Sequence, residues 1–476
     1  MSAPAFRLRE VQLFERDVRL RLPFRFGVVT LTECPQIFVR ARIETADGRS
    51  GWGMAAEMLA PKWFDKNLAL TNEDNFDQLR LATKTASELY LGDRIARTAF
   101  GFFEAHYRAQ IDICRDLGLN ALIACYGPAL LDRAMLDALC RLEGLSFYTA
   151  IQLNLPGIGS EFLAPDLDGF DIGPFLSSRT PAASIAARHT VGLVDPITTA
   201  DATSRVDDGL PETLEEVCAA YGHTWFKLKV GGDIKADIAR LSAIAAVLDR
   251  GPAYRSTLDG NEQYDDVDAV IELWRRIGET PALKRLAASV IFIEQPIKRQ
   301  QALSRDVKAL AALKPVIVDE SDDTLDAFTR ARLLGYAGIS SKTCKGFYKS
   351  LLNAARVARW GGGTMMSAED LTTQAGISVQ QDLALVNLIG LTHVERNGHH
   401  YVDGFAGAPP AETARFLAAH PDLYHRTGGK VRLKIAAGQL AIGSLAHPGF
   451  AVGAEPDWQA TRPMPQPRST FATASA

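Results

Sequence analysis

Several features that would assign this chain to a membrane, a secretory route or a nucleic acid are missing from its 476 residues. No run of about 18 apolar residues occurs, so we expect no transmembrane helix and no membrane partner. The charged residues Arg7, Arg9 and Glu10 stand where a signal peptide needs an apolar core. Lysine and arginine number 52 against 56 for aspartate and glutamate, a formal net charge of −4, so we expect no nucleic-acid partner either.

Paired cysteines and glycosylation sequons are also missing. The chain has 6 cysteines, but none forms a Cys-x-x-Cys pair, and no Asn-x-Ser/Thr sequence occurs. Scattered cysteines of this kind are typical of reduced thiols, so we expect a cytoplasmic protein. They are Cys34, Cys114, Cys125, Cys140, Cys218 and Cys344.

The composition supports a large folded core, because 47% of the residues are hydrophobic and 23% are charged. Residues 5–57 alternate in polarity and turn at Ala-Asp-Gly 46–48, which predicts antiparallel strands, and residues 72–144 show helical periodicity. We therefore expect an α+β domain over residues 1–150. Residues 151–188 are rich in Gly, Pro and Asp and predict a long loop or insertion, a kind of segment that often binds ligands.

Strand and helix signals alternate over residues 189–404. Eight such strands with helices between them predict a modified (β/α)₈ barrel of the α/β class. The expected strands are 189–194, 225–230, 254–259, 290–294, 315–319, 338–342, 363–367 and 391–395. Beyond the barrel we expect a small hairpin at 431–435 and 439–442, and a disordered tail over 456–476 that is rich in Pro, Ala, Ser and Thr.

Three successive strands of this barrel end in a carboxylate: Asp259, Glu294 and Asp319. Residues at the carboxyl ends of barrel strands share one mouth, where these acids would repel one another unless a cation lay between them. An all-oxygen ligand set without Cys or His indicates a hard ion, Mg²⁺ or Mn²⁺. The alternative is three unrelated solvated acids at helix starts.

Lysines flank these acids on both sides. Lys227 and Lys229 are two apart on one strand and point the same way, and we expect their repulsion to lower the pKa of at least one of them. Lys342 ends the sixth strand on the opposite side of the ring. Two amines facing each other across a metal suit removal and return of a proton α to a carboxylate. Lys345 is a rival for the second base, and Glu369 is read as a lysine-orienting residue, a substrate contact or a helix-start acid.

A nicotinamide oxidoreductase is disfavoured, because no usable glycine fingerprint is present. Gly157 and Gly159 are followed by Phe162 at the third glycine position and no strand precedes them, and the glycines at 361–363 follow no strand.

The strand-end motifs, in this order, resemble the enolase superfamily, and the lysine on the sixth strand resembles its muconate-lactonizing-enzyme subgroup within the mandelate racemase–muconate lactonizing enzyme family. Two further segments, 22–27 and 51–53, are similar to the family's capping loops. The motifs are Lys-x-Lys at 227–229, Leu-Asp-Gly-Asn at 258–261, Ile-Glu-Gln-Pro at 293–296, Val-Asp-Glu-Ser at 318–321 and Ile-Ser-Ser-Lys-Thr-Cys-Lys at 339–345.

The resemblance implies one Mg²⁺ held by Asp259, Glu294 and Asp319, an acid/base pair of Lys229 and Lys342 tuned by Lys227, and a small carboxylate substrate. It also implies a capping domain completed by about residues 405–455 and, by analogy, a homo-oligomer. Racemisation or epimerisation is the leading hypothesis; a cycloisomerase or a syn-dehydratase could use the same site, and a non-catalytic binding protein is a remote alternative. Candidate substrate contacts are Arg25, Trp52, Glu57, Asn261, Lys345 and Glu369.

Overall fold

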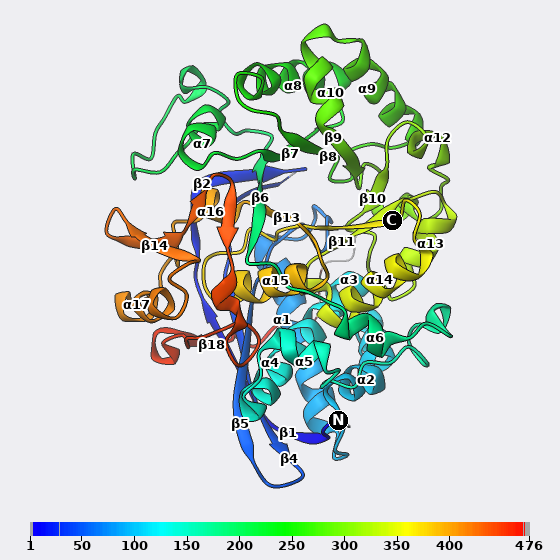
Figure 1. The fold of residues 1–476 in the computed structure, drawn as a ribbon, viewed down its shortest axis with the longest axis vertical. Helices are drawn as coiled ribbons and strands as arrows, with labels where there is room; N and C mark the ends of the chain where they lie inside the picture. The colour runs from blue at the N-terminus through cyan, green and yellow to red at the C-terminus, as the bar shows by residue number, and fades with distance from the viewer. Residues whose placement is uncertain (1–2, 28, 470, 472–476) are drawn as a thin grey trace.

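The computed structural model describes residues 3–27, 29–469 and 471. It consists of an N-terminal α+β part and a barrel, and Figure 1 shows the blue strands β1, β4 and β5 at one end of the molecule and green barrel strands such as β7 and β8 toward the other. A four-stranded sheet with the order β18-β1-β4-β5 forms the N-terminal part. Its strands are β1 (Phe6–Arg16), β4 (Gln36–Thr45), β5 (Ser50–Met58) and β18 (Arg462–Pro463).

Local sequence explains the elements of this part. The hairpin between β4 and β5 turns at Gly48, whose φ of 84° favours glycine, which confirms the predicted turn. Helix α1 begins at a capping box in which Thr71 and Asp74 each bond the other's backbone N–H. The helices are α1 (Asn72–Gly92), α2 (Ala99–Asp116), α3 (Ala121–Ala124), α4 (Tyr126–Glu143) and α5 (Phe147–Gln152).

The two segments expected to be capping loops are strands. Residues 22–27 fall largely in β2 (Arg19–Phe26), which pairs with β3 (Val29–Glu33). Residues 51–53 lie inside β5, where Gly53 packs directly on α4. A Cβ at Gly53 would stand 2.1 Å from the Ala134 carbonyl oxygen, so this glycine is needed for the close approach of helix and strand.

Strands β6 to β13 form the barrel, and every ladder pair between neighbouring barrel strands is parallel. β13 pairs with β6, and β12 lies beside β13, so the predicted modified (β/α)₈ barrel with an α+β capping part is confirmed. The first strand begins earlier than expected, at Ser184 rather than residue 189. The strands are β6 (Ser184–Val191), β7 (Trp225–Lys229), β8 (Arg255–Asp259), β9 (Val290–Glu294), β10 (Val316–Val318), β11 (Gly338–Ser341), β12 (Met365–Ala368) and β13 (His393–Arg396).

Helices follow the barrel strands and cover the outside of the barrel. In α9, buried Val270, Leu273 and Ile277 recur at helical spacing and form the face that packs inward. The helices are α7 (Leu214–Tyr221), α8 (Ile234–Leu248), α9 (Val267–Glu279), α10 (Lys284–Ser289), α11 (Arg299–Ala302), α12 (Lys308–Ala311), α13 (Ala327–Leu333), α14 (Phe347–Trp360), α15 (Ile377–Leu388) and α16 (Gly398–Tyr401).

The C-terminal segment differs from the expectation in two ways. The hairpin expected at 431–435 and 439–442 is divided: β15 (Lys430–Leu433) pairs with β14 (Tyr424–Thr427), whereas β16 (Ile435–Ala436) and β17 (Gln439–Ala441) join the barrel sheet beside β6. The expected disordered tail is ordered over 456–469, where β18 pairs with β1; residues 470 and 472–476 lie outside the described residues. This segment is ordered by edge pairing with β1 and by ion pairs such as that between Arg468 and Asp77. Amino-acid composition alone does not predict such long-range contacts. Between β13 and β14 lies α17 (Pro410–Ala419).

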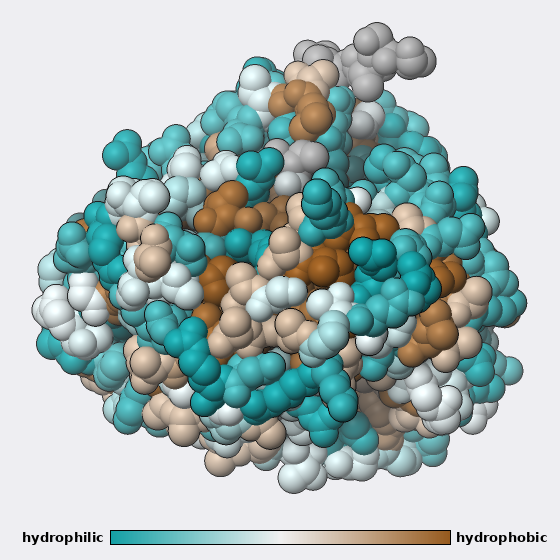
Figure 2. All heavy atoms as spheres, turned by 90° about the horizontal axis from the view of Figure 1, so that it is seen from above, coloured by the Kyte–Doolittle hydropathy of each residue, from teal (hydrophilic) through white to brown (hydrophobic). Residues whose placement is uncertain are grey.

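The segment 151–188, expected to be a loop or insertion, contains α6 (Ile172–Ser177) and the first residues of β6, and the stretch before β6 contacts α14. Asp166 forms an ion pair with Arg356 of α14, with 2.7 Å between the carboxylate and guanidinium atoms. Figure 2 shows a face of the molecule with hydrophobic residues near its middle and hydrophilic residues around them. Within residues 3–27, 29–469 and 471, no helix has the length and apolar character needed to cross a membrane.

Replacement of Gly53 by alanine should destabilise the fold. The added methyl would overlap the α4 backbone, so we expect Gly53→Ala to lower the free energy of unfolding by about 1–3 kcal/mol, measured by urea denaturation. Gly278→Ala, at an exposed position of α9 with nothing within 4 Å, is the control and should be neutral or slightly stabilising. Equal effects of the two substitutions would contradict the packing argument.

Candidate active site

The predicted acids converge at the carboxyl ends of the barrel strands. Asp259 ends β8, Glu294 ends β9 in direct register with Asp259, and Asp319 follows β10. All three are buried. Asp259 and Asp319 line one pocket, together with Phe24, Phe26, Leu31, Ala60, Trp63, Lys227, Lys229, Asn261, Lys342, Asp370, Leu371, Thr372, Glu395 and Asn397.

Lys227 and Lys229 both reach this pocket, as their spacing of two on β7 predicts. Lys229 Nζ lies 2.5 Å from Asp259 Oδ2, and Lys227 Nζ lies 2.8 Å from the same oxygen. Lys227 Nζ also lies 2.9 Å from Glu294 Oε1. The ammonium groups therefore hold two of the acids close together.

Lys227 also binds carboxylates of the last two barrel strands. Its Nζ lies 2.8 Å from Glu369 Oε2 and 3.1 Å from Glu395 Oε2. Burial alone would lower the pKa of Lys227, but the surrounding carboxylates raise it well above its ordinary value. The expectation that repulsion between the lysines lowers a pKa is therefore wrong for Lys227, because the four carboxylates around it outweigh that repulsion. Glu395 was missed, although it lies at the end of an expected strand.

Lys342, rather than Lys345, lines the pocket. Lys342 Nζ lies 2.8 Å from Asp319 Oδ2 and 4.1 Å from the centre of the Trp63 ring. Burial disfavours its charge, but Asp319 raises the pKa of Lys342 above its ordinary value. Lys345 Nζ donates to the Ser340 carbonyl at 2.9 Å and lies 3.2 Å from Asp322 Oδ2 and 3.3 Å from Asp319 Oδ1, so it is a buried cation that contacts Asp319 without lining the pocket.

The candidate substrate contacts divide into two groups. Asn261 lines the pocket, whereas Glu369 is buried outside the pocket lining and contacts Arg188 and Lys227. These contacts favour the role of Glu369 as a residue that orients a lysine. Arg25 is exposed, and Trp52 is stacked by Arg40, whose guanidinium lies 4.4 Å from the ring centre.

Glu57 also lies outside the pocket lining. Its Oε2 lies 3.1 Å from both Arg133 Nη2 and Thr343 Oγ1. The cap residues that do line the pocket are Phe24, Phe26, Leu31, Ala60 and Trp63. Phe24 and Phe26 were in the segment singled out, and strand alternation turns them inward and Arg25 outward. No short-range signal in the sequence marks Trp63.

The donor set fits a hard divalent cation. The carboxylates come from three neighbouring strand ends, and Glu294 Oε2 is buried with no hydrogen-bond partner among the described residues. Burial, with Asp259 and Glu369 nearby, raises the pKa of Glu294 well above its ordinary value. A cation would satisfy this oxygen and offset the repulsion between the acids.

Removal of the Lys227 charge should destabilise the protein strongly. Lys227→Met would leave buried carboxylates without their shared partner, so we expect a loss of about 3–5 kcal/mol in the free energy of unfolding, measured by urea denaturation. Lys235→Met, at an exposed position of α8, is the control and should change little. A loss below about 1 kcal/mol for Lys227→Met would contradict this role.

Glu57 should make stability depend on pH. Burial, opposed by Arg133, raises the pKa of Glu57 from 4.5 to about 7. Because the pKa of Glu57 is higher in the folded than in the unfolded protein, protonated Glu57 favours the folded state. This stabilisation is fully present below the unfolded pKa and is lost as pH rises through the folded pKa. Glu57→Gln should therefore gain stability relative to the parent between about pH 5 and pH 8, in denaturation at each pH. Glu88→Gln, at an exposed position of α1, is the control and should have the same stability as the parent at both pH values.

Comparisons with known proteins agree with the fold. A family model described as enolase C-terminal domain-like matches residues 209–420. A search of curated proteins finds no match. Among solved structures, a muconate lactonizing enzyme from Pseudomonas fluorescens, complexed with muconolactone, is 18% identical with a TM-score of 0.58 over 96% of this chain and 98% of that one.

Two further solved structures are similar and contain magnesium. A dipeptide epimerase from Enterococcus faecalis, complexed with Mg and a dipeptide, is 15% identical with a TM-score of 0.59 over 94% of this chain and 99% of that one. An enolase from Bradyrhizobium, complexed with magnesium and mandelic acid, is 16% identical with a TM-score of 0.59 over 97% of this chain and 98% of that one. The resemblance inferred from the strand-end motifs is thus confirmed: residues 209–420 match the model of the enolase C-terminal domain-like family, and the chain as a whole has the fold of mandelate racemase- and muconate lactonizing enzyme-like members of the enolase superfamily.

Proposed function

We propose that this chain is a Mg²⁺-dependent enzyme that removes the proton α to a carboxylate, with racemisation or epimerisation of a small carboxylic acid as its reaction. The supporting observation is the placement of two amines in one pocket. Lys229 comes from β7 and Lys342 follows β11, and these strands lie four places apart in the order β11-β10-β9-β8-β7. In a ring of eight strands, this spacing places the amines on opposite sides.

Each of these two amines contacts a different carboxylate. Asp259 orients Lys229, and Asp319 orients Lys342. Asp259, Glu294 and Asp319 would hold Mg²⁺. When bound, this ion stabilises the negative charge of the substrate carboxylate and the further negative charge that develops on it when the α-proton leaves. Lys229 would exchange a proton with the α-carbon on one face and Lys342 on the other. Lys227 would keep the surrounding acids together.

The remaining pocket walls suit a small acid. Phe24, Phe26 and Trp63 come from the cap and carry no charge, so they would exclude water from the reacting carbon and strengthen the electrostatic interactions beside it. Cycloisomerisation or syn-dehydration needs proton transfer by one lysine only. The matched pairing of both lysines favours the two-base reaction, and unchanged product mass would separate it from dehydration. The expected homo-oligomer and cytoplasmic location stay predictions.

Deuterium exchange tests the proposal. In D₂O with Mg²⁺, the full chain should introduce deuterium at the α-carbon of at least one acid in a library of small chiral carboxylates, observed by NMR and mass spectrometry. Lys229→Ala should lose exchange of one stereoisomer and Lys342→Ala exchange of the other, each by about 10²–10⁴-fold, and both should lose interconversion.

Chelation of Mg²⁺ should stop the exchange, and Lys235→Ala should leave it unchanged. Because Lys345 does not line the pocket, Lys345→Ala should spare the stereochemical selectivity even if it lowers stability. If the metal-loaded parent exchanges no acid of the library, or if both pocket-lysine variants lose the same stereoisomer, the two-base assignment is wrong.

A further inference from the structure

A cluster of histidines lies on the outside of the barrel, on the other face of the strands that carry the acid pocket. His189 is on β6, His223 directly precedes β7, and His399 is in α16. On β6, Arg188 and Thr190 reach Glu369 and Glu395 inside the barrel. Because side chains alternate along a strand, His189 points outward.

The imidazoles of this cluster are close enough to share one ion. One ring nitrogen from each of His189, His223 and His399 lies within 4.8 Å of the other two. The ring centres of His189 and His223 are 5.3 Å apart, and that of His399 is 5.6 Å from each of them. No carboxylate belongs to this group among the described residues.

The hydrogen bonding of His223 leaves a nitrogen free to bind a ligand. His223 Nδ1 lies 3.0 Å from the Ala187 carbonyl oxygen, and because a carbonyl only accepts, Nδ1 carries the proton. His223 Nε2 therefore presents a lone pair, and it is buried without a partner among the described residues. A backbone carbonyl on the second ring nitrogen is the usual support of a metal-binding histidine.

The other rings also present buried nitrogens without partners. These are His189 Nδ1 and both ring nitrogens of His399, again within the part of the chain that the structure describes. Aromatic packing alone would account for the stacked rings but not for these polar atoms. A buried polar atom without a partner destabilises the folded state, so several of them in one place indicate a missing common partner.

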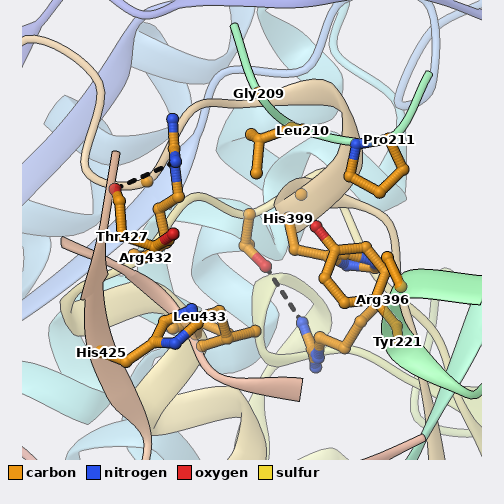
Figure 3. Close-up of a pocket in the computed structure, with 16 residues that line it drawn as sticks. Gly209, Leu210, Pro211, Tyr221, Arg396, His399, His425, Thr427, Arg432 and Leu433 are labelled. Carbon is orange, nitrogen blue, oxygen red and sulfur yellow. Dashed lines mark hydrogen bonds between the residues drawn. The ribbon is translucent and has the colours of Figure 1, made fainter. Parts of the chain in front are cut away.

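A cavity borders the cluster at His399. His399 and Tyr221 lie side by side in its wall, with ring centres 5.3 Å apart (Figure 3). The cavity has a volume of about 170 Å³, which leaves room for an entering ion and for water at an open coordination position. None of the metal-ligand candidates Asp259, Glu294 and Asp319 lines it.

We propose that His189, His223 and His399 form a second metal site that binds a borderline transition-metal ion of the Zn²⁺ class. Three imidazoles and an open fourth position suit Zn²⁺, whereas Mg²⁺ requires oxygen ligands. Nitrogens bound tetrahedrally at about 2.1 Å from zinc stand about 3.4 Å apart, so binding would draw the three rings slightly together.

Metal titration of the full chain, freed of any purification tag, tests the site. The protein is stripped with chelator and kept in excess Mg²⁺, which competes with the added ion for the carboxylates. Zn²⁺ titration by calorimetry should then show one further ion per chain, and Co²⁺ should give the visible absorption of a four- or five-coordinate nitrogen site. X-ray absorption on the Zn²⁺-loaded parent should show imidazole ligands.

Variants separate the cluster from the rest of the chain. His399→Gln and His223→Gln should lose the tight Zn²⁺ site, with circular dichroism used to confirm folding. His447→Gln, at a histidine outside the cluster that lies 3.1 Å from the Ala419 carbonyl oxygen, should keep it. Asp319→Asn should also keep the Zn²⁺ site while weakening Mg²⁺ binding, which separates this proposal from the proposed barrel chemistry.

The proposal is overturned if the parent binds no Zn²⁺ or Co²⁺ in excess Mg²⁺, or if both folded cluster variants bind as the parent does. If the variants fail to fold, the X-ray absorption spectrum of the Zn²⁺-loaded parent is the test. A spectrum without imidazole ligands also overturns the proposal.

Discussion

A buried ammonium group holds the carboxyl ends of the barrel strands together. Lys227 Nζ contacts Asp259, Glu294, Glu369 and Glu395, which lie at the ends of β8, β9, β12 and β13. Carboxylates at this depth repel one another strongly, since little water screens them. The acids can converge at the strand ends only because a cation lies between them, and Glu294 Oε2 still has no hydrogen-bond partner among the described residues.

The cap completes this electrostatic arrangement from above. Trp63 lies over Lys342, and the Lys66 ammonium reaches down to Glu262 at 2.5 Å and to the Asn261 carbonyl oxygen at 2.7 Å. Apolar walls and an ion pair between cap and barrel thus enclose the charged floor of the pocket. Because water is excluded, the electrostatic interactions in the pocket are stronger, and the ion pair fastens the cap to the barrel.

Strand alternation separates two kinds of chemistry on the first barrel strands. On β6, Arg188 and Thr190 belong to the ionic network inside the barrel, while His189 between them belongs to the histidine cluster outside. The inner face has oxygen donors balanced by amines, and the outer face has imidazole nitrogens. The two faces therefore favour different metal ions, although they are built on the same strand.

The sequence by itself determined the strand-end chemistry, the barrel and the family resemblance. Periods of two and of three to four residues set which residues face inward, so Lys227, Lys229, Asp259 and Lys342 could be assigned to the pocket before any coordinates. The strand ends were correct within a few residues, because charged residues terminate apolar runs such as 290–294.

Only the tertiary structure decided which cap residues meet the pocket and which lysine of 342 and 345 faces it. Trp63 reaches the pocket across nearly 300 positions of sequence from Lys342, and no local pattern records such a contact. The order of the tail at 456–469 likewise depends on pairing with β1 at the opposite end of the chain. Local periodicity reports the direction in which a side chain points, whereas the partner that it meets is set by long-range packing.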